Sequence, residues 1–217
     1  MAYQVIGVVG CGLMGAGIAQ LSAQSGYRTF VREVDKETVR KGLSRIEGSL
    51  ASGVERGKLS SATKEATMSN LIGTTSLEKM AECDLVIEAI VEDLTAKQEV
   101  FSALEAIVRP ETVFASNTSS LCITEMASGT SRPDRFIGLH FFSPVPVMKL
   151  VEVIRGLATS DETYKQIFAF SETLGKEPVT APDRPGFIAN RLLIPYLLDA
   201  VRAYECGVGT IEDIDKT

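Results

Sequence analysis

The sequence predicts an α/β protein with a doubly wound, mostly parallel sheet, followed by the start of an all-helical region. Strand-like apolar runs alternate with helical segments from residue 3 to residue 182, the pattern typical of such sheets. The first strand leads directly into glycines at positions 10, 12 and 15, spaced G-x-G-x-x-G. The alternation ends near Pro185, where a long apolar segment begins. Together these observations predict a Rossmann-type domain over residues 1–184 and the beginning of a helical domain over residues 185–217.

The first strand–helix–strand unit is the clearest part of the pattern. The β-branched run "YQVIGVVG" predicts a buried parallel strand, and "LMGAGIAQLSAQSG" predicts a helix that stops at Gly26. The run "RTFVRE" predicts the second strand. A long polar helix is expected over residues 35–58, with Leu43, Ile46 and Leu50 on one side.

The alternation continues to residue 182. Further strands are expected at 70–75, 83–90, 112–120, 136–144 and 150–154, and an edge strand at 177–182. Helices are expected over 94–108, closed by Pro110, and over 161–175.

The segment from about Phe187 to Glu205 is apolar nearly all round. A helix of this kind has to be buried against other helices or against a second chain, so we expect a homodimer through the C-terminal helices. "GTIEDIDKT" then begins another capped helix, and the second domain is expected to be incomplete within these 217 residues.

Composition excludes several classes of function. The net charge of −6 argues against nucleic acid as the main partner. No apolar run is long enough to cross a membrane, and no signal segment is evident at the N-terminus. The four cysteines, Cys11, Cys83, Cys122 and Cys206, form no C-x-x-C pair. We therefore expect a cytoplasmic protein with free thiols and no metal site.

The glycine motif has two interpretations. A G-x-G-x-x-G that follows a strand and opens a helix lets backbone N–H groups face a pyrophosphate, and Glu33 ends the second strand about 20 residues further on. A carboxylate there can accept both ribose hydroxyls of NAD and repel the 2′-phosphate of NADP, although Arg32 leaves an opening for NADP. Alternatively, the glycines only pack helix on strand.

Four later motifs point to a family. "EAIVEDLTAKQEVF", "ASNTSSL", "GLHFFSPVPVMKLVEV" and "PGFIANRLL" resemble the 3-hydroxyacyl-CoA dehydrogenase family, and the resemblance runs from Val5 to Lys216. It implies an NAD domain followed by a helical domain that dimerises and closes the acyl site. Members carry further helices after "IEDID", so the chain resembles a member that lacks most of that domain.

His140 and Glu152 are the candidate catalytic pair. His140 is the only histidine, and Glu152 is an acid in an apolar strand, where a buried carboxylate needs a partner. By the residues alone, Glu152 pairs either with His140 or outward with Lys149 or Arg155. The resemblance implies that His140 is the general base and that Glu152 orients it.

The resemblance also implies roles for other residues. It places Asn190 at the substrate, where the alternative is a helix cap. Ser119 is expected beside the substrate because its turn follows a strand at the carboxyl edge of the sheet, where ligands bind, although alone it is an ordinary turn residue. The resemblance assigns Ser49, Arg56 and Ser119 to the CoA moiety, where the alternative is a solvated helix face. The expected cofactor contacts are Gly10, Cys11, Gly12, Leu13, Met14, Gly15, Glu33, Glu92, Lys97, Ser119 and Ser143.

The predicted function is NAD-dependent, reversible oxidation of (S)-3-hydroxyacyl-CoA to 3-oxoacyl-CoA. Two alternatives stay open: an NAD-binding module without turnover, and a dehydrogenase of the same superfamily that acts on a small hydroxy acid. A hydrolase using Ser119, His140 and Glu152 is disfavoured because the chain has no G-x-S-x-G elbow.

Overall fold

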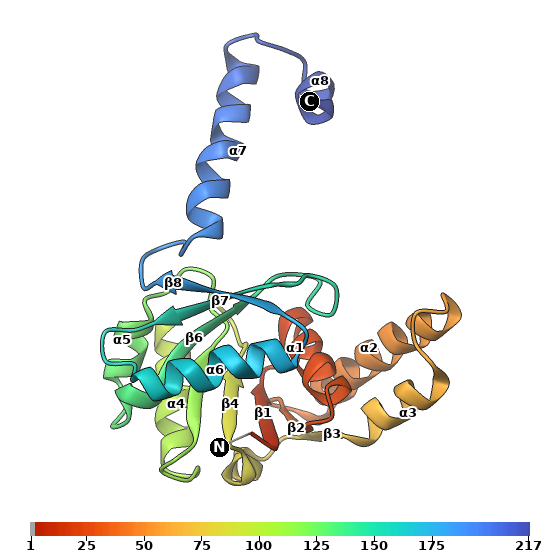
Figure 1. Cartoon of the computed structure of the whole chain (residues 1–217), viewed down its shortest axis with the longest axis vertical. Helices are drawn as coiled ribbons and strands as arrows, with labels where there is room; N and C mark the ends of the chain where they lie inside the picture. The colour runs from red at the N-terminus through yellow and green to blue at the C-terminus, as the bar shows by residue number, and fades with distance from the viewer. Residues whose placement is uncertain (1–2) are drawn as a thin grey trace.

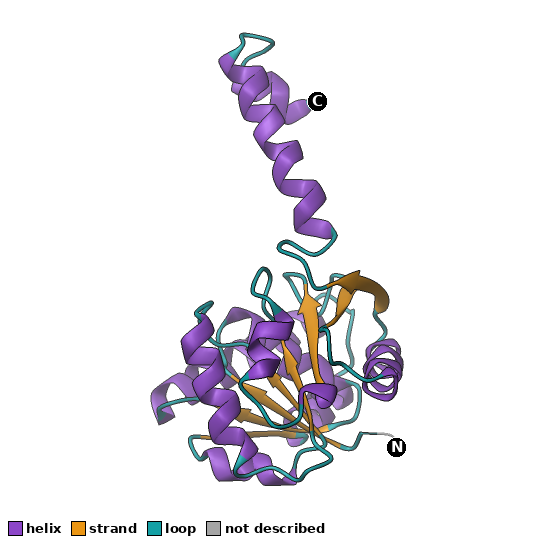
Figure 2. Ribbon diagram, turned by 90° about the vertical axis from the view of Figure 1, so that its left-hand side faces the viewer, coloured by secondary structure: helices purple, strands orange, loops and turns teal. Residues whose placement is uncertain are grey.

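The structure is a computed structural model that describes residues 3–217. These residues form one eight-stranded sheet with helices on both faces and a helical arm at the C-terminal end (Figures 1 and 2). The strands are β1 Val5–Val9, β2 Arg28–Arg32, β3 Leu71–Thr74, β4 Leu85–Glu88, β5 Val113–Ser116, β6 Phe136–Phe141, β7 Leu150–Arg155 and β8 Glu177–Pro182. The helices are α1 Leu13–Gln24, α2 Lys36–Glu55, α3 Ser61–Ser69, α4 Leu94–Glu105, α5 Ile123–Ser128, α6 Asp161–Thr173, α7 Ala189–Glu205 and α8 Ile211–Lys216.

The strand order confirms the predicted doubly wound sheet. Across the sheet the order is β3-β2-β1-β4-β5-β6-β7-β8. The strands from β3 to β6 are parallel, β7 runs antiparallel to β6, and β8 is parallel to β7. The chain leaves β1 in one direction and returns to its other side with β4. The loops after β1 and β4 therefore diverge, and such a switch point opens a crevice at the carboxyl edge of the sheet.

The core lies on both faces of the sheet, which explains why the central strands read as continuous apolar runs. On one face, β1 contributes Ile6 and Val8 to a cluster that includes residues of α1, α2 and α6. On the other face, Val86 and Phe114 pack with residues of α4 and α5. The sheet is thus packed between two buried layers. This packing fixes the strands and therefore the positions of the loops at the carboxyl edge of the sheet.

Most helices begin at a side chain that caps the first turn. Asp35, Ser60, Asp93, Ser160 and Thr210 each accept a hydrogen bond from the backbone N–H three residues further on. Helix α1 differs because Gly12 at its N-cap has no side chain, and its first turn carries no acidic residue. The start of α1 is therefore left without a capping carboxylate.

The structure differs from the sequence-based expectation in a few local elements. Helices α3 and α5 were not predicted, because α3 is polar with weak periodicity and α5 has only six residues. Helix α4 ends at Glu105, before Pro110. Helix α7 begins at Ala189 rather than near Phe187, because Gly186 and Phe187 have positive φ angles of 77° and 46°.

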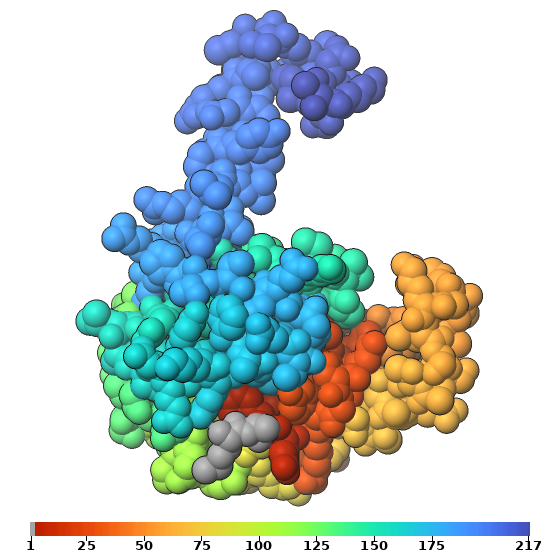
Figure 3. Space-filling model, in the orientation of Figure 1, coloured from red at the N-terminus to blue at the C-terminus, as the bar shows by residue number. Residues whose placement is uncertain are grey.

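Helices α7 and α8 project away from the sheet as an arm (Figures 1 and 3). No residue of α7 is buried. Its exposed apolar side chains include Leu192, Leu193, Ile194, Leu197, Leu198 and Val201. Nothing within residues 3–217 covers this surface, so the predicted packing partner of α7 is not part of the described chain.

No helix of the described residues is both long enough and apolar enough to cross a membrane. Within the same residues, no cluster of three or more histidine, cysteine, aspartate or glutamate side chains is arranged to bind a metal ion. All four cysteines carry free thiols, two of them buried and two exposed.

Candidate active site

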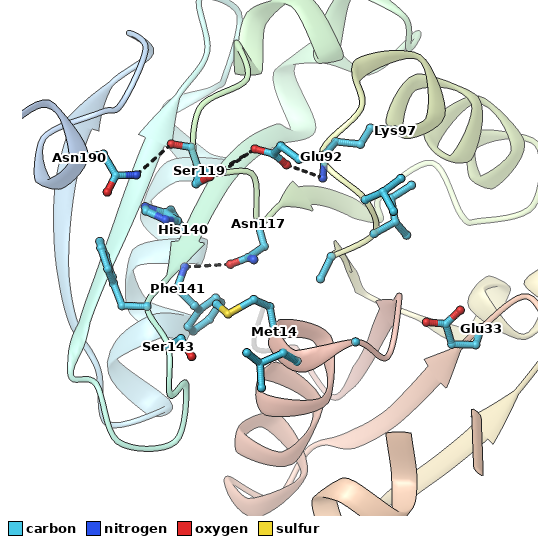
Figure 4. Close-up of a pocket in the computed structure, with 16 residues that line it drawn as sticks. Met14, Glu33, Glu92, Lys97, Asn117, Ser119, His140, Phe141, Ser143 and Asn190 are labelled. Atoms are coloured by element: carbon cyan, nitrogen blue, oxygen red, sulfur yellow. Dashed lines mark hydrogen bonds and ion pairs between the residues drawn. The ribbon is translucent and has the colours of Figure 1, made fainter. Parts of the chain in front are cut away.

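A cleft of about 620 Å³ lies at the carboxyl edge of the sheet, above the switch point between β1 and β4 (Figure 4). Its walls come from the start of α1, the ends of β2, β4, β5 and β6, and the start of α7. The lining residues are Gly12, Leu13, Met14, Glu33, Ala89, Ile90, Val91, Glu92, Lys97, Asn117, Ser119, His140, Phe141, Phe142, Ser143 and Asn190.

The glycines of the first turn have different physical roles. Gly10 has a φ of 98° and lies against the backbone of Ala89, so a side chain is excluded there. A Cβ on Gly15 would overlap the carbonyl oxygen of Gly10. A Cβ on Gly12, in contrast, would have no atom within 4 Å. Gly10 and Gly15 therefore shape the turn, whereas Gly12 leaves open space in the cleft at the uncapped start of α1.

Glu33 closes the other side of this turn. Its carboxylate accepts hydrogen bonds from the backbone N–H of Cys11 at 2.6 Å and of Val34 at 3.1 Å. Cys11 itself is buried, and burial, with the Glu33 charge nearby, raises the pKa of its thiol to about 11. The Cys11 side chain thus stays neutral in the fold, and Glu33 is the group that brings negative charge to this end of the cleft.

A buried ion pair supports the middle of the cleft. Glu88 at the end of β4 is fully buried, and its carboxylate accepts hydrogen bonds from Lys97 Nζ and Ser116 Oγ, each at 2.6 Å, and from the N–H of Ile90 at 2.7 Å. Lys97 Nζ also lies 3.1 Å from Glu92 Oε2. A buried charge is tolerated only when it is paired and fully hydrogen-bonded, and here the partners join β4, α4 and β5.

Glu92 extends this network to the turn after β5. Its Oε1 accepts hydrogen bonds from Thr118 Oγ1 and from the backbone N–H of Ser119 at 3.0 Å. Burial would raise the pKa of the Glu92 carboxyl, but the bond from Thr118 and the charge of Lys97 outweigh it and hold this pKa below its ordinary value. Glu92 therefore stays ionised and fixes the loop that carries Ser119.

His140 and Glu152 face each other across the antiparallel pair of β6 and β7. They are direct partners in the strand register, and His140 Nδ1 lies 2.8 Å from Glu152 Oε2. The other partners proposed for Glu152 are occupied elsewhere, because Lys149 pairs with Glu177 and Arg155 with Asp161. The expected pairing is present, and the Nε2 side of the imidazole is the side left for chemistry in the cleft.

The second oxygen of Glu152 receives two backbone hydrogen bonds from the start of α7. Oε1 accepts from the N–H groups of Ile188 and Ala189, both at 2.9 Å. Burial would raise the pKa of the Glu152 carboxyl, but the hydrogen bonds from His140, Ala189 and Ile188 outweigh it and hold this pKa below its ordinary value. Glu152 is therefore a carboxylate that is fully satisfied although it is buried.

Ser119 and Asn190 come together at the far end of the cleft. Asn190 is the second residue of α7 rather than its cap, and its Nδ2 lies 3.5 Å from the carbonyl oxygen of Ser119. Both residues also line a neighbouring open cavity of about 700 Å³, with Pro185, Gly186 and Arg191. Within residues 3–217 the Ser119 hydroxyl contacts Glu92 and not His140, so no nucleophile–base pair of a hydrolase is formed.

The remaining predicted residues are distributed unevenly. Leu13, Met14 and Ser143 line the cleft. Ser49 lies beside a small cavity between α1, α2 and the loop after β6. Arg56 is at the C-cap of α2, and its Nε donates to the carbonyl oxygen of Ser52. Neither Ser49 nor Arg56 lines the main cleft.

Sequence reasoning missed three residues of the site. Glu88, like Glu152, is an acid inside an apolar strand, and this pattern indicates a buried carboxylate that needs partners. Asn117 directly follows β5, and its Oδ1 accepts a hydrogen bond from the N–H of Phe141 at 2.9 Å, which joins β5 to β6. Phe187 packs its ring against His140, and nothing local in the sequence indicates this contact.

Comparisons with known proteins agree with this geometry. Residues 5–184 match the family described as "3-hydroxyacyl-CoA dehydrogenase, NAD binding domain", and residues 186–217 match the family's C-terminal domain. A probable 3-hydroxybutyryl-CoA dehydrogenase from Deinococcus radiodurans is 47% identical over 209 residues, which cover 96% of this chain and 75% of that protein.

Two crystal structures share the fold. FadB2 from M. tuberculosis has a TM-score of 0.96 and 43% identity, and the match covers 98% of this chain and 75% of that one. The (S)-3-hydroxybutyryl-CoA dehydrogenase PaaH1 from Ralstonia eutropha has a TM-score of 0.95 and 40% identity over the same shares of the two chains.

The fold and the cleft define a Rossmann-type, dinucleotide-binding oxidoreductase. More narrowly, the chain belongs to the 3-hydroxyacyl-CoA dehydrogenase family, and residues 5–184 are its NAD-binding domain. The predictions of fold class, family and cofactor are confirmed.

The two helix-turn glycines give a testable contrast. Gly12→Ala adds a methyl group in open space, so we expect the free energy of unfolding to change by less than about 0.5 kcal/mol and NADH affinity to fall by about tenfold. Gly15→Ala meets the Gly10 carbonyl and should cost about 1–3 kcal/mol of stability. Denaturant unfolding and fluorescence titration with NADH measure the two effects. A Gly12→Ala variant with full NADH affinity would remove Gly12 from the cofactor site.

Proposed function

We propose that this chain catalyses the reversible, NAD-dependent oxidation of (S)-3-hydroxyacyl-CoA to 3-oxoacyl-CoA, with His140 as general base and Glu152 as the residue that orients it. The observation that carries the proposal is the buried His140–Glu152 pair at the end of a dinucleotide cleft. The names of the relatives, which are 3-hydroxybutyryl-CoA dehydrogenases, support the substrate class.

The described residues fit a bound NAD. The open space at Gly12 and the uncapped start of α1 suit a pyrophosphate, because helix N-termini favour anions. Glu33 would hold the adenosine ribose, and Leu13, Met14, Glu92, Lys97, Ser119 and Ser143 would line the remainder. When bound, NAD supplies the acceptor for the hydride that leaves C3 of the substrate.

His140 would take the proton from the substrate hydroxyl. Its Nδ1 is held by the Glu152 carboxylate, which keeps the N–H on Nδ1 and leaves Nε2 as the basic atom. As Nε2 gains the proton, the imidazolium is stabilised by the carboxylate 2.8 Å from Nδ1. The aromatic ring of Phe142 packs against the imidazole, with the two ring centroids 4.4 Å apart.

Ser119 and Asn190 would hold the substrate beside this base. Glu92 fixes the Ser119 loop, and Asn190 bonds to it from α7, so both side chains are presented at one point of the cleft. Their polar groups suit the oxygen atoms at C3 and at the thioester carbonyl. For the CoA moiety we propose Ser49 on α2 and Arg56 at the C-cap of this helix, where the guanidinium can bind a phosphate.

Cofactor selectivity tests the assignment of Glu33. We expect NADH to bind more tightly than NADPH, because the Glu33 carboxylate repels a 2′-phosphate. Glu33→Gln keeps an acceptor for the Cys11 N–H but removes the charge. The ratio of the dissociation constants for NADPH and NADH should therefore fall by about tenfold. Fluorescence titration with both cofactors measures this. Tighter binding of NADPH by the unchanged protein would refute the assignment.

The base is tested by two substitutions. His140→Gln should lower kcat with acetoacetyl-CoA by about 10²–10⁴-fold, while NADH affinity stays the same. Glu152→Gln should cause a smaller loss. It should also move the acid limb of the pH–rate profile to lower pH, since a neutral amide stabilises the imidazolium less than a carboxylate does. Near-normal turnover of His140→Gln would exclude His140 as the base.

We also propose that the exposed apolar side chains of α7 form the interface of a homodimer. Full burial of such a side chain contributes roughly 1.5–3 kcal/mol, and a bare patch of this kind favours association. Light scattering should show concentration-dependent dimers. Leu197→Glu should shift them to monomers, whereas Asp199→Asn, two residues away, should not. A monomer at every concentration would contradict the proposal.

A further inference from the structure

The segment that leads into α7, residues 185–189, has an unusual backbone. We call it the α7 lead-in. Gly186 has a φ of 77°, and Phe187 has a φ of 46°, the only positive φ at a non-glycine residue among residues 3–217. A left-handed backbone is unfavourable for a side chain with a Cβ, and such residues persist only where surrounding contacts impose them. The contacts made by the lead-in therefore indicate what this conformation is for.

The Phe187 side chain turns inward to the catalytic pair. It is 1% exposed, and its ring centroid lies 5.7 Å from that of the His140 imidazole. Phe142 contacts the same imidazole at 4.4 Å. The base is thus packed against one aromatic ring from the loop that follows β6 and a second ring from the lead-in.

The backbone of the lead-in contacts the other residue of the catalytic pair, Glu152. The N–H groups of Ile188 and Ala189 donate to Glu152 Oε1, while Oε2 holds His140. A single carboxylate is therefore shared between the base and the first turn of α7. Because a hydrogen bond to one oxygen draws charge from the other, the two contacts are linked electrostatically.

We propose that Phe187 is a positioning residue and that the α7 lead-in couples the placement of α7 to the basicity of His140. When the lead-in is seated, its ring shields the imidazole and its N–H groups draw charge from Glu152. When it moves away, Glu152 acts on His140 alone and water reaches the ring. The inference rests on the proposed role of His140 as base, and extends it to a segment outside the sheet.

The other charged groups near the pair belong to different contacts. Glu92 and Lys97 pair with each other, Glu33 lies with Cys11 at the other end of the cleft, and Arg191 lines the neighbouring cavity. Within residues 3–217, none of these side chains is hydrogen-bonded to His140 or Glu152. The titration of His140 should therefore respond mainly to Glu152 and its donors.

The first test removes one donor without changing a side chain. His140 is the only histidine, so its imidazole gives one resolvable titration by NMR without any turnover. Replacing the backbone amide of Ala189 by an ester deletes the N–H to Glu152. We expect the titration midpoint of His140 to rise by about 0.5 pH unit, because Glu152 then stabilises the imidazolium more strongly. The same replacement at Ala203, further along α7, is the control and should leave the midpoint unchanged.

The second test changes the ring. Phe187→Leu should lower kcat about tenfold and leave NADH affinity unchanged. It should also raise the midpoint of the His140 titration, because water then reaches the imidazole. Phe187→Tyr keeps the ring and should return kcat and this midpoint to the values of the unchanged protein. Phe101→Leu, in the same buried cluster but on α4, controls for lost packing and should not move the midpoint.

The two proposals fail in different ways. An unchanged His140 midpoint in the ester variant and in Phe187→Leu would overturn the coupling, even if the enzyme turns over hydroxyacyl-CoA normally. A shifted midpoint together with no activity on any 3-hydroxyacyl-CoA would support the coupling and refute the substrate assignment.

Discussion

The burial of Glu152 opposite His140 is the constraint on which the site depends. Strand β7 runs antiparallel to β6, and this pairing sets the two residues directly across from each other. Side chains alternate between the faces of a sheet, so a slip of one residue would turn Glu152 to the other face and separate the pair. A buried carboxylate also requires donors for both oxygens, and these come from the imidazole and from the start of α7. The register of two strands thus determines where the helical arm joins the domain.

Glu88, on the other side of the cleft, also needs hydrogen-bond donors for its buried carboxylate. It is a second fully buried carboxylate, and its donors come from α4, from β5 and from the loop after β4. Lys97 then passes the contact to Glu92, which holds the turn with Ser119. Two acids placed in apolar strands therefore organise the loops on both sides of the proposed substrate position. Neither acid lies at the surface, where its partners would be exchanged for water.

The domain and the arm differ in how they are stabilised. The sheet has two buried layers and holds the glycine turn, Glu33 and the β6–β7 register of the catalytic pair. The arm has no buried residue in α7 and contacts the domain at the lead-in and through Asn190. Cofactor contacts thus belong to the self-supporting part of the chain. The proposed substrate contacts, Ser119 and Asn190, lie instead where α7 joins the sheet domain.

The sequence by itself determined the elements whose signals are local. Apolar runs located the central strands, the glycine spacing located the turn after β1, and the interval to Glu33 located the acid at the end of β2. The only histidine and an acid in an apolar strand singled out His140 and Glu152, and the family motifs implied that the two form a pair. Only the tertiary structure decided the partners of Glu88, the two N–H donors from α7, the contact of Phe187 with the imidazole, and helices α3 and α5. Local periodicity reports which face of an element is apolar, but not which distant residue meets it. Those contacts join positions far apart in the chain, such as Glu152 and Ala189, and a buried charge selects its partners only once the strands are in register.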